Sequence, residues 1–185
     1  MLPEFASLLE TPTFKAFGIA LAPLSLGHVF LLESIQSPLI TNTAKAEISD
    51  LLLLVLVCSR PYQEASKTLK DPELATRIES MAQTWAKTLS KTTTIEEQAK
   101  TIEAYLLHYL QAPPRWGGSG SRLKTPWQLY LITQLQKELG ITEQEAWSMP
   151  CNKAFGYYAA IAEGYGDKEL MTDEEAKRVS EINNE

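Results

Sequence analysis

The sequence predicts an all-α protein, and three observations carry that prediction. Apolar residues recur at spacings of three and four, which is the period of an amphipathic helix. Few segments show the period of two expected of a half-buried strand. Four capping boxes mark helix starts, because in each a threonine and a Glu or Gln three residues later satisfy backbone N–H groups that the helix leaves unpaired. The boxes are Thr94 with Glu97, Thr125 with Gln128, Thr142 with Glu145 and Thr172 with Glu175. We therefore expect a multi-helix bundle.

The first 22 residues fit two interpretations. In the stretch PTFKAFGIALAPLSL, alternate residues can be assigned to two opposite faces. One face would hold Phe14, Ala16 and Gly18, and the other Phe17, Ile19 and Leu21. This pattern allows a short N-terminal strand or hairpin, and an extended arm is the alternative.

The N-terminal body is expected to contain four helices. They cover residues 25–36, 44–59, 72–90 and 95–111. Prolines set most of the boundaries, with Pro23 before the first helix, Pro38 after it, Pro61 after the second and Pro72 at the start of the third. Residues 51–58 are eight consecutive apolar residues, well short of the roughly 20 that span a membrane. We expect this run to be a buried helix, with Cys58 a small buried residue.

Residues 112–124 (APPRWGGSGSRLK) predict a flexible linker. Two prolines end the preceding helix, and three glycines follow. A phosphate-binding loop is the alternative, but such a loop follows a strand and ends in Gly-Lys-Ser/Thr. This segment follows a predicted helix and lacks that ending, so we prefer the linker interpretation. It separates the body, residues 1–111, from a smaller C-terminal unit, residues 125–185. Trp116 lies inside the linker, where it either anchors the loop on the body or binds a partner.

The C-terminal unit is expected to contain helices at residues 126–139, 143–148, 152–163 and 173–182, with Gly140 ending the first of them. It also holds the whole net charge of −6. Residues 1–140 contain 13 acidic and 13 basic residues, whereas residues 141–185 contain 10 acidic and 4 basic ones. Because an acidic segment repels phosphate, we expect no nucleic-acid binding through it, and a solubilising role is the ordinary interpretation. A helix-turn-helix at residues 125–165 is disfavoured, since its second helix would carry Lys153 as its one basic residue.

No catalytic, metal-binding or cofactor-binding constellation is recognisable. His28 and His108 each lie among apolar neighbours, without a second ligand at metal-binding spacing. The carboxylate pairs fall in the first turns of predicted helices, where they complement the helix dipole. A Cys–His pair formed by Cys58 or Cys151 stays open from sequence alone. Because no such constellation is recognisable, we expect a non-enzymatic protein without cofactors. With no secretory leader at the N-terminus, we expect the protein to be cytoplasmic.

Aromatic residues gather in the C-terminal unit, and they have two interpretations. The cluster comprises Trp147, Phe155, Tyr157, Tyr158 and Tyr165. It forms either a core face that packs on helix 126–139 through Trp127, Tyr130, Leu131 and Leu135, or an apolar ridge for a partner helix. For the second interpretation, the candidate partner-binding residues are Trp116, Trp147, Phe155, Tyr158 and Ile161.

Residues 139–150 (LGITEQEAWSMP), followed by an aromatic helix, resemble the C-terminal end of phage tail assembly chaperones. Residues 23–28 (PLSLGH) and 58–60 (CSR) are similar to segments of small proteins of phage tail modules. The resemblance implies a bacteriophage protein of the host cytoplasm that keeps the long helical tape measure protein soluble and helps to recruit tail tube proteins. The alternatives are a structural virion or head–tail adaptor component, a small helical enzyme and a DNA-binding protein. Oligomeric state stays open, and no membrane association is expected.

Overall fold

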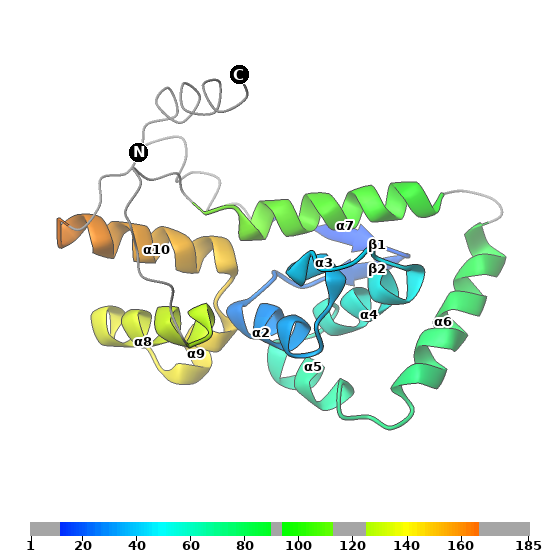
Figure 1. Cartoon of the computed structure of the whole chain (residues 1–185), viewed down its shortest axis with the longest axis horizontal. Helices are drawn as coiled ribbons and strands as arrows, with labels where there is room; N and C mark the ends of the chain where they lie inside the picture. Colours follow the sequence, from blue (N-terminus) through cyan, green and yellow to red (C-terminus); the bar gives the residue numbers. More distant parts are fainter. Residues whose placement is uncertain (1–11, 90–93, 113–124, 167–185) are drawn as a thin grey trace, which may run out of the picture. The chain divides into compact units, whose positions relative to one another are not determined.

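The computed structural model of the chain describes residues 12–89, 94–112 and 125–166 (Figure 1). Within these residues it contains nine helices and one two-stranded antiparallel sheet, which confirms the all-α class with a short N-terminal hairpin. The described residues form two compact units that meet in sequence between Tyr109 and Leu110. The sequence predicted a body that ends at residue 111. Most of the predicted linker, the predicted helix at residues 173–182 and its capping box at Thr172 lie outside the described residues.

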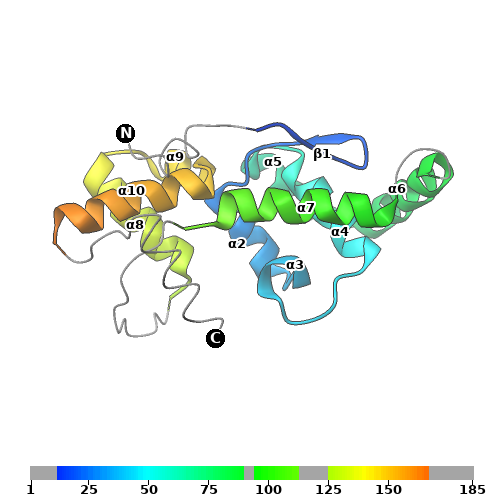
Figure 2. The same ribbon diagram turned by 90° about the horizontal axis from the view of Figure 1, so that it is seen from above.

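The N-terminal unit begins with the hairpin of β1 (Phe14–Ala16) and β2 (Ile19–Leu21). Its two turn residues, Phe17 and Gly18, both have positive φ, at 52° and 77°, as a tight hairpin turn requires. Positive φ is rare for a bulky residue such as phenylalanine. Here the Phe17 N–H donates to Gln98 Oε1 at 2.6 Å, which holds the turn in place. The hairpin lies along α7 (Ile95–Leu110) (Figure 2).

The core of the N-terminal unit is built around α4 (Ile48–Cys58), seven of whose eleven residues are buried. This helix contacts β2 and four other helices: α2 (Leu26–Ser34), α3 (Pro38–Thr41), α5 (Tyr62–Thr68) and α6 (Leu74–Leu89). The buried apolar helix predicted from residues 51–58 is confirmed. The sequence prediction missed α3 and α5. Pro38 and Pro61 were assigned only as stops, but a proline that ends one helix also favours the first turn of the next.

One face of α7 is turned toward the interior of the N-terminal unit. Ile102, Tyr105 and Tyr109 are buried, and Leu106 and Leu110 are half-buried. The helix begins at the predicted capping box, in which the Glu97 N–H donates to Thr94 Oγ1 and the Thr94 N–H donates to the Glu97 carboxylate.

The C-terminal unit contains α8 (Trp127–Leu139), α9 (Glu143–Ser148) and α10 (Cys151–Gly164). Gly140 ends α8, as predicted, and does so in the left-handed conformation, with φ of 66°. The capping box predicted at Thr142 is formed with Glu145. The capping box predicted at Thr125 is wrong. Pro126 is the N-cap of α8, so Gln128 falls one position too early, and its side chain is fully buried.

Candidate partner-binding surface

The C-terminal unit is organised around a seam between α8 and α10. Ring contacts join Trp127 to Phe155, with centroids 5.5 Å apart, and Tyr130 to Tyr158 at 6.0 Å. Farther along, the Tyr165 hydroxyl donates to Glu138 Oε2 at 2.8 Å. The last two pairs are separated by 28 and 27 residues in sequence, so residue numbers rise together along the seam. The two helices therefore run parallel, as Figure 1 also shows.

One side of this seam is a partly exposed line of tyrosines. Tyr158, Ile161 and Tyr165 follow one another at spacings of three and four, which places them in one stripe along α10. Tyr157 lies beside the stripe and Tyr130 faces it from α8. Tyr130, Tyr157 and Tyr165 are 37%, 46% and 62% exposed, and Tyr158 and Ile161 are half-buried. We call Tyr130, Tyr157, Tyr158, Ile161 and Tyr165 the tyrosine edge.

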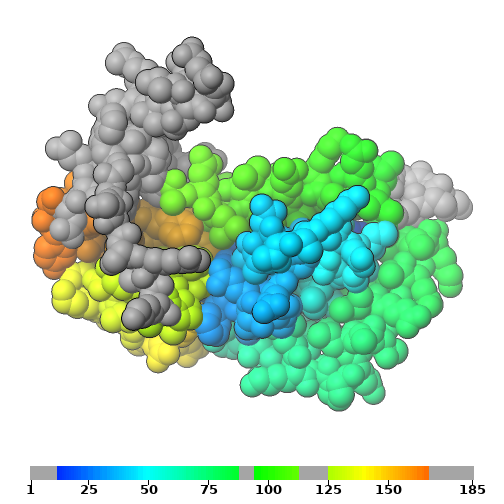
Figure 3. Space-filling model, viewed as in Figure 1, coloured from blue at the N-terminus to red at the C-terminus, as the bar shows by residue number. Residues whose placement is uncertain are grey.

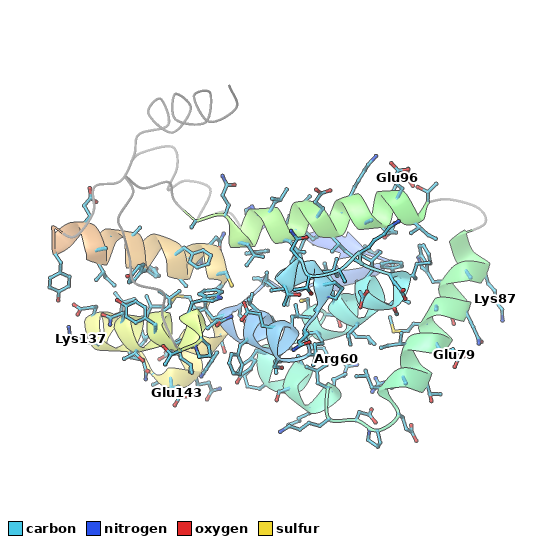
Figure 4. All side chains as sticks on the ribbon, viewed as in Figure 1. Arg60, Glu79, Lys87, Glu96, Lys137 and Glu143 are labelled. Carbon is cyan, nitrogen blue, oxygen red and sulfur yellow. The ribbon has the colours of Figure 1, made fainter. Side chains whose placement is uncertain are left out.

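The end of the tyrosine edge carries a small polar cluster. Lys137 Nζ lies 2.8 Å from Glu138 Oε1 and 5.8 Å from the centre of the Tyr165 ring (Figure 4). The Lys137 ammonium and the Tyr165 hydroxyl lower the pKa of the Glu138 carboxyl. The same hydrogen bond to Glu138 raises the pKa of the Tyr165 hydroxyl. The phenol therefore stays neutral, and its ring is held against the end of α8.

The structure places the predicted partner-binding residues in three different settings. Tyr158 and Ile161 belong to the tyrosine edge. Trp147 is buried, and its Nε1–H donates to Glu143 Oε1 at 3.2 Å, so its ring offers little surface to a partner. Phe155 is half-buried against Trp127, as the packing interpretation predicted. Trp116 lies outside the described residues.

Three members of the tyrosine edge were absent from the predicted binding set. Tyr157 and Tyr165 had been placed in the aromatic cluster, but the sequence pattern did not show that they would be exposed. Tyr130 belongs to the packing interpretation of the aromatic cluster, which names it with Trp127, Leu131 and Leu135 as a contact residue of helix 126–139. The parallel arrangement of α8 and α10 is what puts Tyr130 on an outer side of the seam, and no local signal in the sequence specifies it.

In the N-terminal unit, residues 23–28 and 58–60 are brought together around His28. Its Nε2–H donates to the Arg60 carbonyl at 2.8 Å, and its Nδ1 accepts the Ser25 backbone N–H at 3.2 Å. The Ala22 N–H also donates to the Cys58 carbonyl at 2.7 Å. Burial lowers the pKa of His28, the bond to the Arg60 carbonyl opposing it only in part. The neutral, buried imidazole forms hydrogen bonds through both ring nitrogens, to Ser25 and to Arg60, and in this way it stabilises the fold.

The thiol of Cys58 is unsuited to nucleophilic chemistry. Burial raises its pKa to about 12, and a hydrogen bond with Tyr105 offsets only part of that effect. At neutral pH the sulfur is therefore a protonated thiol, which is a poor nucleophile. Within the described residues, no three His, Cys, Asp or Glu side chains are grouped so that they could hold a metal ion. No described helix is both long and apolar enough to cross a membrane.

Comparisons with known proteins add no relative. No protein-family model, curated protein or solved structure matches this chain.

Proposed function

We propose that the chain is a non-catalytic, phage tail assembly chaperone-like protein that holds a long helical partner through the tyrosine edge. The observation that carries this proposal is the placement of exposed aromatic residues. Among the described residues, the large apolar side chains that are exposed in the N-terminal unit are all aliphatic: Ile35, Ile48, Ile95 and Leu107. The exposed aromatic ones are Tyr130, Tyr157 and Tyr165, all in the C-terminal unit.

Tyrosine is suited to such a surface for a physical reason. Its ring contributes a large apolar area, while its hydroxyl can stay hydrated before the partner arrives. Tyrosine is accordingly enriched among the residues that dominate binding energy. The stripe of Tyr158, Ile161 and Tyr165 has the spacing that packs along an amphipathic helix. The resemblance to tail assembly chaperones supplies the partner, a tape measure protein, with tail tube proteins as further partners in the host cytoplasm.

The proposal is tested by affinity capture from cells that express the tagged full chain with its native gene neighbourhood, read by mass spectrometry. The result expected is recovery of one very long, helix-rich protein. Recovery of capsid, portal or tail tube proteins without it would overturn the proposal in favour of a structural adaptor.

A matched pair of variants shows whether capture depends on the tyrosine edge. The double variant Tyr157→Ser/Tyr165→Ser should reduce recovery at least about tenfold, the equivalent of losing roughly 1.4 kcal/mol. Leu107→Ser is the control, because Leu107 is 62% exposed, like Tyr165, but lies on α7 in the other unit. The control should capture the partner normally, and both variants should unfold at the same urea concentration as the unaltered chain. Equal capture by both variants would exclude the tyrosine edge as the binding surface.

A further inference from the structure

Helix α10 ends in a turn that changes the direction of the chain. The Tyr165 N–H donates to the Ile161 carbonyl at 3.1 Å, and the Gly166 N–H donates to the Glu163 carbonyl at 2.9 Å. Gly166 has a φ of 71°, the left-handed conformation that commonly ends helices. The C-terminal end of α10, orange in Figure 3, lies at the surface of its unit. The chain therefore turns at the surface, one residue after the last member of the tyrosine edge.

Residues 167–185 follow this turn, and we call them the acidic segment. Their sequence predicts a helix at residues 173–182, which leaves residues 167–172 as its connection to α10. Helices that are joined by so short a connection are usually antiparallel neighbours. We therefore expect the predicted helix to run back along α10.

The predicted helix has an apolar stripe that matches the tyrosine edge in length. Ala176, Val179 and Ile182 follow one another at spacings of three, so they lie on one face of the helix. At about 1.5 Å per residue, this stripe is about 9 Å long, and the stretch from Tyr157 to Tyr165 is about 12 Å long. Both tyrosines are exposed, and contact with the stripe would shield their rings from water. The tyrosine edge is therefore a suitable surface for the stripe.

The charges beside the tyrosine edge are opposite in sign to the net charge of the acidic segment. Lys137 lies seven residues after Tyr130 on α8, and Lys153 lies four residues before Tyr157 on α10. Each lysine therefore shares a helix face with its tyrosine. Lys137 is mostly exposed although it is paired with Glu138, so its ammonium can also meet a second carboxylate. The acidic segment contains 7 acidic and 3 basic residues, a net charge of −4 (3 − 7), which favours it as the occupant of this surface.

We propose that the acidic segment binds to the tyrosine edge of its own chain, antiparallel to α10, and is displaced when the helical partner binds. This inference rests on the proposed function, because it assigns a regulation to the same surface. In the antiparallel arrangement, the acidic residues 173–175 lie near Lys137 and the later part of the segment lies near Lys153. The segment lowers the apparent affinity for the partner, because only molecules with an open tyrosine edge can bind it.

The first test is carbodiimide cross-linking of the unaltered full chain, in which a lysine amine and a carboxylate in contact are joined with loss of water. Mass spectrometry of the monomer fraction should show Lys137 linked to the segment at residues 173–175. Links from Lys137 to Glu181 or Glu185 in their place would overturn the antiparallel arrangement. Absence of any link from Lys137 or Lys153 to the segment would overturn the proposal, as would links confined to cross-linked dimers.

The second test compares two double variants of the full chain by fluorine NMR, with all tyrosines fluorinated. Val179→Ser/Ile182→Ser removes the apolar stripe and should shift the resonances of Tyr157 and Tyr165. The matched control is Lys177→Ser/Glu181→Ser, which keeps the net charge and alters the opposite face, since each site lies two residues from Val179. The control should leave both resonances unchanged. Equal spectra of the two double variants would overturn the proposal.

Both tests are carried out without the partner, so their failure is distinguishable from a failure of the proposed function. A chain that captures no helical partner can still show the cross-link and the shifts, and a chain that captures one can lack them. Once the partner is captured, the Val179→Ser/Ile182→Ser chain should recover about threefold more of it than the control chain, because more of its molecules have an open edge. Equal recovery by the two would overturn the displacement.

Discussion

The two units place their tyrosines in opposite ways. In the N-terminal unit, Tyr105 and Tyr109 are buried, and the Tyr105 hydroxyl donates to the Ala22 carbonyl at 2.8 Å. In the C-terminal unit, Tyr130 and Tyr165 are exposed. The Tyr130 hydroxyl lies within hydrogen-bond reach of the hydroxyl of the half-buried Tyr158, and the Tyr165 hydroxyl donates to Glu138. Tyr105 and Tyr109 thus pack inside the N-terminal unit, whereas Tyr130 and Tyr165 lie on the surface of the C-terminal unit.

This difference predicts which tyrosine substitutions affect stability and which affect binding. A buried tyrosine hydroxyl needs its hydrogen bond to a backbone carbonyl in the folded state, because leaving a buried polar group unpaired costs free energy. An exposed phenol bonded to another side chain contributes little to folding and can change its partners when another protein arrives. We therefore expect substitutions in the first group to alter the free energy of unfolding, and substitutions in the second to alter binding.

The largest expected effect compares Tyr105→Ala with Tyr165→Ala. Removal of the buried Tyr105 ring should lower the free energy of unfolding by about 3–5 kcal/mol, the range found for large-to-small changes in cores. Tyr165→Ala should change it by less than about 0.5 kcal/mol. Urea unfolding of both variants measures the difference, and similar losses in the two would abolish the distinction between the units.

The next effect concerns close packing in the N-terminal unit. A methyl group added at Gly27 of α2 would overlap the ring of Tyr62 on α5. Gly27→Ala should therefore destabilise the chain by about 1–2 kcal/mol, the overpacking cost being larger than the gain in helix propensity. Gly164→Ala is the control, since a methyl group there meets no atom within 4 Å. Thermal unfolding should rank Gly164→Ala at or above the unaltered chain, and the reverse ranking would refute the packing argument.

The third effect is the pH dependence produced by His28. Burial lowers its pKa below 6.5, so the unfolded chain binds a proton more readily than the folded chain. The stability it contributes is complete above pH 6.5 and is lost as the pH falls from there through its folded pKa, by up to about 1.4 kcal/mol per pH unit. Urea unfolding between pH 7.5 and 5 should show this slope. In the His28→Gln chain the slope should be nearly absent, and an unchanged slope would assign it to other groups.

The smallest effect compares two helix starts within the C-terminal unit. Thr142→Ala removes an N-cap that is bonded to the Glu145 N–H, and should cost about 1 kcal/mol. Thr125→Ala should be neutral, because Pro126, not Thr125, is the N-cap of α8. A cost at Thr125 as large as that at Thr142 would restore the capping box that the structure lacks.

Local signals in the sequence specified most of the helices but not their arrangement. The boxes at Thr94 and Thr142 and the stop at Gly140 depend on residues within four positions of each other, so they could be predicted. For the short helices α3 and α5, the prolines at positions 38 and 61 mark only a possible helix start. Helices this short also depend on packing against α4, which the local sequence does not report.

In the candidate surface, too, some features follow from the local sequence and others depend on tertiary packing. The stripe that contains Tyr158 and Ile161 follows from helical spacing within α10, and both were predicted. Tyr130 joins it only because α8 and α10 run parallel, which brings its ring against that of Tyr158. Trp147 combines both kinds of information: its hydrogen bond to Glu143 follows from the four-residue spacing within α9, whereas its burial depends on how α9 packs.

The most direct test of the central claim is fluorine NMR of the full chain with all seven tyrosines fluorinated, before and after addition of the captured helical partner. Four tyrosines lie in the C-terminal unit, at positions 130, 157, 158 and 165, and three in the N-terminal unit. We expect the four resonances of the C-terminal unit to shift or broaden when the partner binds. A bound partner that leaves all four unchanged would contradict this expectation.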